Sequence, residues 1–384
     1  MVDKLEGRLC SYIDGETWDP PTSPFLTPVT NPTFSFDLEN ILRRGRPDTF
    51  GKPPRRIGCI DCWKVGRNKL VAHGMGDTSS GAVRRTSAKI DGKGDGTKEV
   101  SVETLQYVEK CRGEGLIPCG WTGPSGYKYE EGDTPLVVLL SLIRLIFLIL
   151  WLVLCCCVTI IILLPAMPFG LARRQALANY FGHTFGWGVV RILGTPYRVA
   201  GEKYAGYGQR RPVLYLSNHC SVLDVILCMW QVPLYTVGIG KKEIVYVPVF
   251  GWLYYLAGHY RIDRKNRKSA IESLNKAADW MVEKQLSMML YPEGTRSTTG
   301  HLAHFKKGFA HMALRTGLPI VPIVLTGTHK AWKNHTTRFR AAPLSITFLP
   351  PIDTTGWTID KLDLHIKEVE YIFNEALPHD QKML

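Results

Sequence analysis

The chain has 384 residues, of which 45% are hydrophobic and 21% charged. This composition excludes a wholly disordered, collagen-like or coiled-coil protein, and a polytopic transporter would be far more apolar. The net charge of +13 predicts an anionic partner, and nucleic acid, an acidic membrane and a phosphorylated substrate fit that sign equally well. Ten cysteines in a chain of this length do not indicate a small disulfide scaffold.

The first part of the chain, residues 1–134, is rich in Pro, Gly, Asp, Thr and Lys, and its apolar runs are short and interrupted. Such a segment buries little apolar surface, so we expect it to be largely disordered or weakly structured. Residues 1–6 mix acidic and basic side chains without an apolar run, and we therefore expect no secretory signal peptide.

Residues 135–168 are almost wholly apolar and are expected to be embedded in a membrane. The uncharged run Leu145–Leu164 reaches the roughly 20 residues that a bilayer-spanning helix needs. A single span and a helix hairpin that dips into one leaflet both fit the length. Arg173 and Arg174 follow the apolar run, and by the positive-inside bias the downstream domain faces the cytosol.

Residues 169–384 alternate between strand-like and helix-like patterns and are expected to form the catalytic domain. Alternating units predict an α/β fold with a mostly parallel sheet flanked by helices. The apolar runs that we interpret as strands are residues 212–217, 235–239, 286–291, 319–325 and 344–348, and the helical patterns cover residues 222–230, 268–283 and 359–377.

A histidine and an aspartate follow the first of these strands, in the sequence Asn218-His-Cys-Ser-Val-Leu-Asp224. On one continuous helix, five positions would turn the two side chains well apart. If His219 lies in the turn and Asp224 in the first helical turn, the carboxylate can reach the ring and fix its tautomer. The other ring nitrogen is then free to act as a general base.

Three further blocks follow this one in order, and they are Gly258–Arg264, Tyr291–Ser297 and Val321–Ile323. Together with Asn218–Asp224, they resemble the glycerolipid acyltransferase family. The lysine-rich run at 241–242 and the sequence around Arg264 are similar to 1-acyl-glycerol-3-phosphate acyltransferases of the plant endoplasmic-reticulum type. The resemblance covers roughly residues 180–350 and implies the fold of that family.

The resemblance implies a role for each matching residue. His219 is implied as the base that deprotonates the acceptor hydroxyl, with Asp224 orienting it, and acyl-CoA as an already activated donor. Ser221 remains a rival nucleophile, since Ser–His–Asp chemistry also transfers acyl groups, and Cys220 is another. The residues implied in substrate binding are Lys241, Arg264, Glu293, Gly294, Thr295 and Arg296, with Lys242 and Arg261 as alternatives for the phosphate contact.

The resemblance therefore implies transfer of an acyl group from acyl-CoA to the sn-2 hydroxyl of lysophosphatidate at the endoplasmic-reticulum membrane. We expect no metal and no cofactor beyond the co-substrate acyl-CoA, and no nucleic-acid partner. The alternatives are another lysophospholipid or glycerol-3-phosphate as acceptor, or a lipid-binding protein without turnover. Asn334-His-Thr336 matches a glycosylation pattern that a cytosolic domain would not use.

Overall fold

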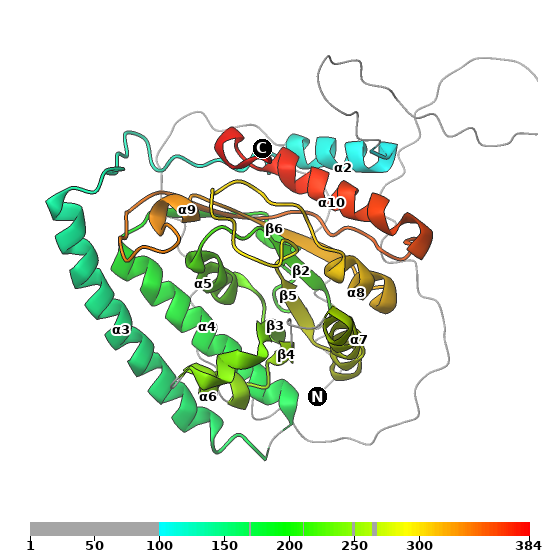
Figure 1. Ribbon diagram of the computed structural model, residues 1–384, viewed down its shortest axis with the longest axis horizontal. Coiled ribbons are helices and arrows are strands. Elements are labelled where there is room, and N and C mark those ends of the chain that lie inside the picture. The colour runs from blue at the N-terminus through cyan, green and yellow to red at the C-terminus, as the bar shows by residue number, and fades with distance from the viewer. Residues whose placement is uncertain (1–99, 169, 210, 248–249, 263–266) are drawn as a thin grey trace, which may run out of the picture. The chain divides into compact units, whose positions relative to one another are not determined.

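The computed structural model describes residues 100–168, 170–209, 211–247, 250–262 and 267–384. Most of the region expected to be weakly structured, residues 1–99, lies outside the described residues. The described part forms an α/β unit whose centre is one seven-stranded sheet (Figure 1).

The sheet is mostly parallel, as the sequence predicts. Its strand order is β1-β7-β6-β2-β5-β3-β4, and the pairing of β6 with β7 is antiparallel while the other pairings are parallel. The carboxyl ends of β2, β3, β5 and β6 therefore lie at one edge of the sheet. The strands are β1 (Tyr197–Ala200), β2 (Leu214–Ser217), β3 (Thr236–Lys241), β4 (Tyr260–Ile262), β5 (Ser287–Leu290), β6 (Ile320–Thr326) and β7 (Leu344–Phe348).

Helices cover both faces of the sheet, and each face has its own apolar core (Figure 1). One face is covered by α2 (Val102–Gly113), α7 (Arg267–Lys284), α8 (Gly308–Thr316) and α10 (Leu362–Ala376). The other is covered by α4 (Leu171–Leu193) and α5 (Val222–Gln231), with α3 (Pro135–Leu163) packed outside α4. The remaining helical elements are η2 (Glu202–Tyr204), η3 (Lys242–Tyr246), α6 (Phe250–Leu256), α9 (Thr328–Ala331), η4 (Ile359–Lys361) and η5 (His379–Gln381).

Residues 100–134 are the described end of the region expected to be weakly structured, and they contain one helix, α2. Helix α2 begins at an N-cap, where the Ser101 side chain accepts a hydrogen bond from the Thr104 amide. Val108 and Cys111 of this helix are buried in the same core as α10. The segment contributes few apolar residues, and these are buried in a core made largely by parts of the chain that lie far away in the sequence.

Helix α3 is the long apolar helix that the sequence predicts, and it has two different faces. Among the described residues it is the one helix long and apolar enough to cross a membrane. One face is anchored to the domain: the Ser141 hydroxyl and the Arg144 guanidinium both donate to the Phe339 carbonyl, at 3.3 and 3.2 Å. Farther along, the Trp151 indole donates to the Phe185 carbonyl at 3.1 Å.

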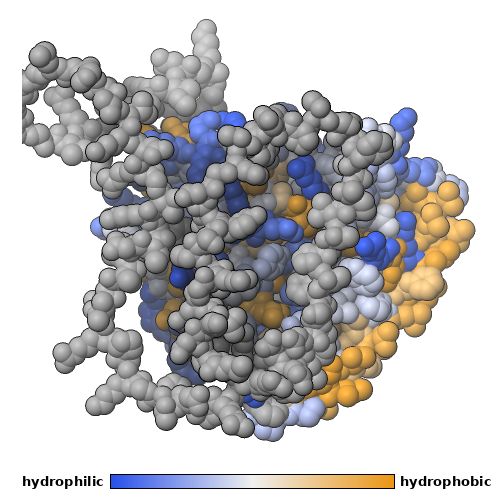
Figure 2. Space-filling view, turned by 180° about the vertical axis from the view of Figure 1, so that it is seen from behind, coloured by the Kyte–Doolittle hydropathy of each residue, from blue (hydrophilic) through white to orange (hydrophobic). Residues whose placement is uncertain are grey.

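The other face of α3 is exposed and apolar. Figure 2 shows hydrophobic side chains gathered along the side of the molecule where α3 runs. Soluble monomers rarely expose contiguous apolar patches of this kind, so the face indicates a membrane or a partner. The exposed residues include Leu136, Leu139, Ile143, Ile146, Phe147, Leu150, Val153, Leu154, Val158 and Ile161.

Candidate active site

The first loop of the site leaves β2 and enters α5, and its backbone is fixed at both ends. The Asn218 side chain donates to the Leu325 carbonyl and accepts from the Leu325 amide, each at 2.8 Å, which ties the loop to β6. Ser221 is the N-cap of α5, where its side chain accepts from the Leu223 amide. Asp224, at the third helical position, accepts from the Ser221 amide and completes a capping box.

This cap places Asp224 beside the His219 ring, as the five-residue spacing predicts. His219 Nδ1 lies 3.0 Å from Asp224 Oδ2, and the same oxygen accepts from the Cys220 and Ser221 amides at 2.6 and 2.7 Å. Because a carboxylate only accepts, Nδ1 carries the proton and Nε2 has the lone pair. Asp224 is fully buried, while the His219 side chain is 13% exposed. Nε2 makes no hydrogen bond within the described part of the chain.

The second loop, Tyr291–Ser297, follows β5 and holds the backbone of His219. Glu293 Oε1 accepts from the His219 amide at 2.6 Å, and Oε2 accepts from the Ala303 amide at 3.0 Å. The Ser297 amide donates to the His219 carbonyl at 2.8 Å. Tyr291 stacks on the imidazole with ring centroids 4.1 Å apart. His219 is thus fixed through its amide, its carbonyl and one face of its ring.

Glu293 is buried, with 3% of its surface exposed. Burial raises the pKa of its carboxyl from 4.5 to about 8, against the opposing effect of the two backbone donors. The position and contacts of Glu293 are those of a residue that organises the loop around His219.

The remaining residues of this loop are more open. Gly294 has a φ of +72°, a backbone conformation that favours glycine, and the end of the flexible Lys306 side chain lies next to it. Thr295 and Arg296 are exposed. The Arg296 guanidinium lies 3.5 Å from Asn334 Oδ1. Arg296 is therefore held beside the His219 loop and still open to a ligand.

The expected cations on β3 and after β4 are only partly described. Lys241 is the last residue of β3 and pairs with Ile262 of β4, which places its backbone at the same sheet edge as His219. Arg261 is exposed, and its guanidinium lies over the Tyr255 ring at 5.2 Å. Arg264 lies outside the described residues, so the choice between it and Arg261 stays open.

The two rival nucleophiles are occupied elsewhere. The Ser221 hydroxyl is buried as the cap of α5 and donates to the Trp332 carbonyl at 2.7 Å. Cys220 Sγ is buried 3.3 Å from Thr328 Oγ1. Burial raises the pKa of the Cys220 thiol well above its usual value, which disfavours a thiolate. Neither side chain is disposed to attack a thioester.

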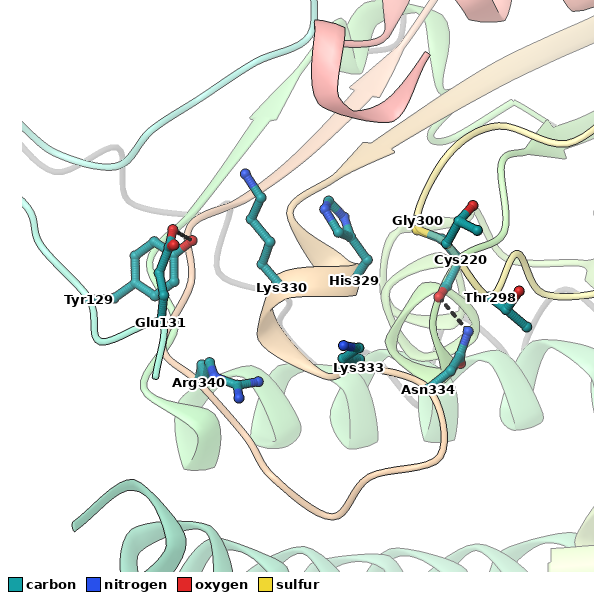
Figure 3. A pocket seen from close by; sticks show the side chains of 11 residues that line it. Tyr129, Glu131, Cys220, Thr298, Gly300, His329, Lys330, Lys333, Asn334 and Arg340 are labelled. Carbon is teal, nitrogen blue, oxygen red and sulfur yellow. Dashed lines mark hydrogen bonds between the residues drawn. The ribbon is translucent and has the colours of Figure 1, made fainter. Parts of the chain in front are cut away.

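A cavity of about 310 Å³ adjoins the first loop on the Cys220 side, and His219 does not line it. Figure 3 shows Lys330, Lys333, Arg340 and Asn334 around it. Two of its cations already have acidic partners, because Lys330 lies 2.6 Å from Asp380 and Arg340 contacts Asp133. The cavity is therefore not lined by the proposed base, and two of its cations are already paired. Within the described ranges, no three His, Cys, Asp or Glu side chains gather as a metal site.

Asn334 is the contact that the sequence analysis missed. Its amide reaches from the loop after α9 to both site loops, across 114 residues in one case. Only its glycosylation pattern stood out in the sequence, and no local spacing connects it to either loop.

A histidine oriented by a buried carboxylate, with its other nitrogen free, is the arrangement of a general-base catalyst. The family model named Acyltransferase matches residues 198–326, which include both site loops. The fold, the site and this match define the protein as an acyltransferase.

Similar proteins of known name identify which family of acyltransferases the chain belongs to. The 1-acyl-sn-glycerol-3-phosphate acyltransferase of Limnanthes douglasii is 42% identical over 257 residues, which cover 66% of this chain and 89% of the relative. The protein of the same name from Cocos nucifera is 41% identical over 257 residues, covering 67% and 82%. The chain therefore belongs to the 1-acyl-sn-glycerol-3-phosphate acyltransferase family.

A solved structure is also similar to the chain. The crystal structure of the 1-acyl-sn-glycerophosphate (LPA) acyltransferase PlsC from Thermotoga maritima aligns with 22% identity and a TM-score of 0.47. The alignment covers 60% of this chain and 94% of that one.

Proposed function

We propose that the protein transfers an acyl group from acyl-CoA to the sn-2 hydroxyl of 1-acyl-sn-glycerol 3-phosphate, giving phosphatidic acid for phospholipid and triacylglycerol synthesis. The observation that carries the proposal is the 3.0 Å contact between His219 Nδ1 and Asp224 Oδ2, which leaves Nε2 available as a base. The acceptor is proposed from the names of the relatives, and from a site loop that presents an exposed arginine.

The proposed reaction needs one base and no enzyme nucleophile, because a thioester is already activated. Nε2 of His219 takes the proton of the sn-2 hydroxyl as its oxygen attacks the thioester carbonyl. The tetrahedral intermediate collapses, the carbon–sulfur bond breaks, and the imidazolium returns its proton to the departing thiolate. Asp224 stabilises the imidazolium and holds the ring in place. The engaged side chains of Ser221 and Cys220 favour this direct attack over an acyl-enzyme route.

The acceptor carries a phosphate monoester, and Arg296 is the cation that we propose for it. A guanidinium presents a planar fork of donors that matches phosphate oxygens. Arg296 is exposed, and its loop is joined to His219 by the 2.8 Å bond from the Ser297 amide. A phosphate on Arg296 would therefore be bound close to the base. Lys241 and Arg264 remain proposed additional contacts, with Lys242 and Arg261 as alternatives.

We further propose that α3 holds the catalytic unit at a membrane, by the exposed apolar face shown in Figure 2. The hydrogen bonds from Ser141 and Trp151, ten residues apart on α3, show that this helix contacts the rest of the domain over several turns. This one-sided contact favours embedding beside the domain over an independent span. Arg173 and Arg174, which follow α3 in the sequence, favour a position of the catalytic unit on the cytosolic side. The similarity to the plant relatives favours the endoplasmic reticulum as the membrane.

The test is product formation by the purified full-length protein in detergent micelles or vesicles. Acyl-CoA is offered with lysophosphatidate, glycerol-3-phosphate or lysophosphatidylcholine, and free CoA thiol and lipid product are measured. The proposal predicts phosphatidic acid, and thiol release that depends on lysophosphatidate. Preferential acylation of another acceptor would refute the acceptor assignment. Binding of lysophosphatidate without thiol release would refute the catalytic proposal.

A further inference from the structure

Asn334 joins the two loops of the site through both ends of its side-chain amide. Nδ2 donates to the Cys220 carbonyl at 2.9 Å and to the Ser297 carbonyl at 2.6 Å. Oδ1 accepts from the Arg296 guanidinium at 3.5 Å. Figure 3 shows the Asn334 side chain directed at the backbone of Cys220. An asparagine amide has two hydrogens, and each one meets a different loop.

The loop that carries Asn334 is itself held in place. The Trp332 carbonyl accepts from the Ser221 hydroxyl at 2.7 Å, and the Trp332 indole donates to the Thr336 carbonyl at 3.0 Å. Phe339 is fully buried, and its amide donates to the Ser141 hydroxyl of α3 at 2.9 Å. The amide of Asn334 therefore projects from a backbone fixed on both sides, which makes it a rigid link.

Two other bonds already connect the loops, and their role differs from that of Asn334. The Glu293 carboxylate and the Ser297 amide both bind the backbone of His219. Those bonds fix the histidine. Asn334 binds the next residue along, Cys220, and in addition contacts Arg296. Asn334 thus links the loop that carries His219, the proposed base, with the guanidinium of Arg296, which we propose binds phosphate.

We propose that Asn334 is a positioning residue that sets the placement of Arg296 relative to His219, an inference that rests on the proposed function of these two residues. The distance between the acceptor's phosphate and its reacting hydroxyl is fixed by the glycerol backbone. The two protein groups must therefore keep a matching separation. Misplacement by about 1 Å can cost on the order of 100-fold in rate.

The same contacts have a consequence for the glycosylation pattern that begins at Asn334. A glycan on Nδ2 would replace one of the two hydrogens and remove the bond to either Cys220 or Ser297. In the folded protein, both hydrogens of the Asn334 amide are already bonded to backbone carbonyls of the site loops. Thr336 completes the pattern. Within the part of the chain that the structure describes, its hydroxyl bonds only to the nearby Lys333 carbonyl, at 3.0 Å, and Thr336 therefore offers a matched control.

The experiment compares three variants of the full-length protein with the wild type, with initial rates measured against both substrates. Asn334→Ala should lower kcat/KM for lysophosphatidate by about 10- to 100-fold, with the KM for acyl-CoA changed less than about threefold. Thr336→Ala removes the glycosylation pattern and should behave as the wild type. Asn334→Asp keeps the shape but turns a carboxylate oxygen toward two carbonyls and adds a negative charge beside Arg296. Its KM for lysophosphatidate should exceed that of Asn334→Ala.

A double-mutant cycle with Arg296→Ala tests why Asn334→Asp raises the KM for lysophosphatidate more than Asn334→Ala does. If the introduced carboxylate acts by competing with phosphate for the guanidinium, its additional effect on the KM for lysophosphatidate disappears in the Arg296→Ala background. The positioning role is overturned if Asn334→Ala stays within about threefold of the wild type. It is also overturned if the carboxylate effect persists without Arg296, or if both KM values rise equally together with a large fall in melting temperature. If the wild type uses a different acceptor, only the acceptor assignment fails, and the variants are compared on that acceptor.

Discussion

Replacing Glu293 by glutamine changes one buried contact that holds the backbone of His219. The carboxyl group accepts from two amides, those of His219 and Ala303, through different oxygens, and both oxygens keep a lone pair for these amides when the group is protonated. A glutamine side chain has nearly the same shape but offers only one acceptor oxygen. Its amide group therefore faces one of the two backbone donors with hydrogens of its own, and that donor loses its partner.

The magnitude follows from the number of bonds lost. One buried amide without an acceptor costs about 1–3 kcal/mol of the free energy of unfolding, compared at about pH 5, where Glu293 is protonated in the folded protein and therefore uncharged like glutamine. The initial rate of Glu293→Gln should fall by about 10- to 100-fold even though the variant stays folded, because a displaced His219 backbone misplaces Nε2 relative to the acceptor hydroxyl. Glu293→Ala orphans both amides and should be more severe in both respects.

The pH dependence of stability gives a second signature. Burial raises the pKa of Glu293 from 4.5 to about 8, so the folded protein holds this proton over a window in which the unfolded chain has released it. The contribution of Glu293 is therefore fully present below the unfolded pKa and is lost as pH rises through the folded one, at up to about 1.4 kcal/mol per pH unit. Glutamine does not titrate and removes this slope.

The assay is unfolding in detergent micelles at pH values between about 5 and 8, together with initial rates. Glu370→Gln is the matched control, since Glu370 is also buried and accepts from the Phe305 amide at 2.9 Å. This control should lose stability while keeping its rate within about threefold. If the wild type and Glu293→Gln show the same pH slope and the same rate, the account of Glu293 is refuted.

Three further predictions concern the other parts of the site and the amino-terminal region. Arg296→Ala should raise the KM for lysophosphatidate by about 10- to 100-fold and leave the KM for acyl-CoA nearly unchanged, because charged hydrogen bonds contribute about 1.5–3 kcal/mol; an equal loss with an acceptor that lacks phosphate would show a structural role. Asp224→Asn should lower kcat by less than removal of His219, since the ring still samples useful orientations, and a larger loss would contradict this order. Deletion of residues 1–99 should leave activity in microsomes within about threefold of the wild type. Deletion of residues 1–134 should lower the melting temperature, because it also removes α2, which is buried against α10. Equal melting temperatures for the two deletion variants would contradict this packing.

Much of the site was predictable because its key contacts are local. His219 and Asp224 are five residues apart, and a strand, a turn and a capped helix suffice to bring them together. The strands β2, β3, β5, β6 and β7 were predicted from their continuous apolar runs, which are typical of buried parallel strands. The three-residue β4 and four-residue β1 are too short to give such a pattern.

The parts that were missed depend on partners far away in the sequence. Asn334 reaches Cys220 across 114 residues, and nothing in its neighbourhood distinguishes it from a surface asparagine. Helix α2 has a weak apolar face that becomes buried only because α10, more than 240 residues later, packs on it. The packing of α3 along α4 depends on close approach, with Trp151 lying over Gly188, which composition cannot indicate.

The central claim is that His219 acts as the base in acyl transfer, and the most direct measurement is the rate of phosphatidic acid formation by His219→Ala. The account predicts a loss of about 100- to 10,000-fold in kcat with acyl-CoA and lysophosphatidate. It also predicts a melting temperature close to that of the wild type, because the bonds that hold the loop through the amide and carbonyl of residue 219 remain in this variant. Activity within a few-fold of the wild type, in a folded variant, would contradict the account.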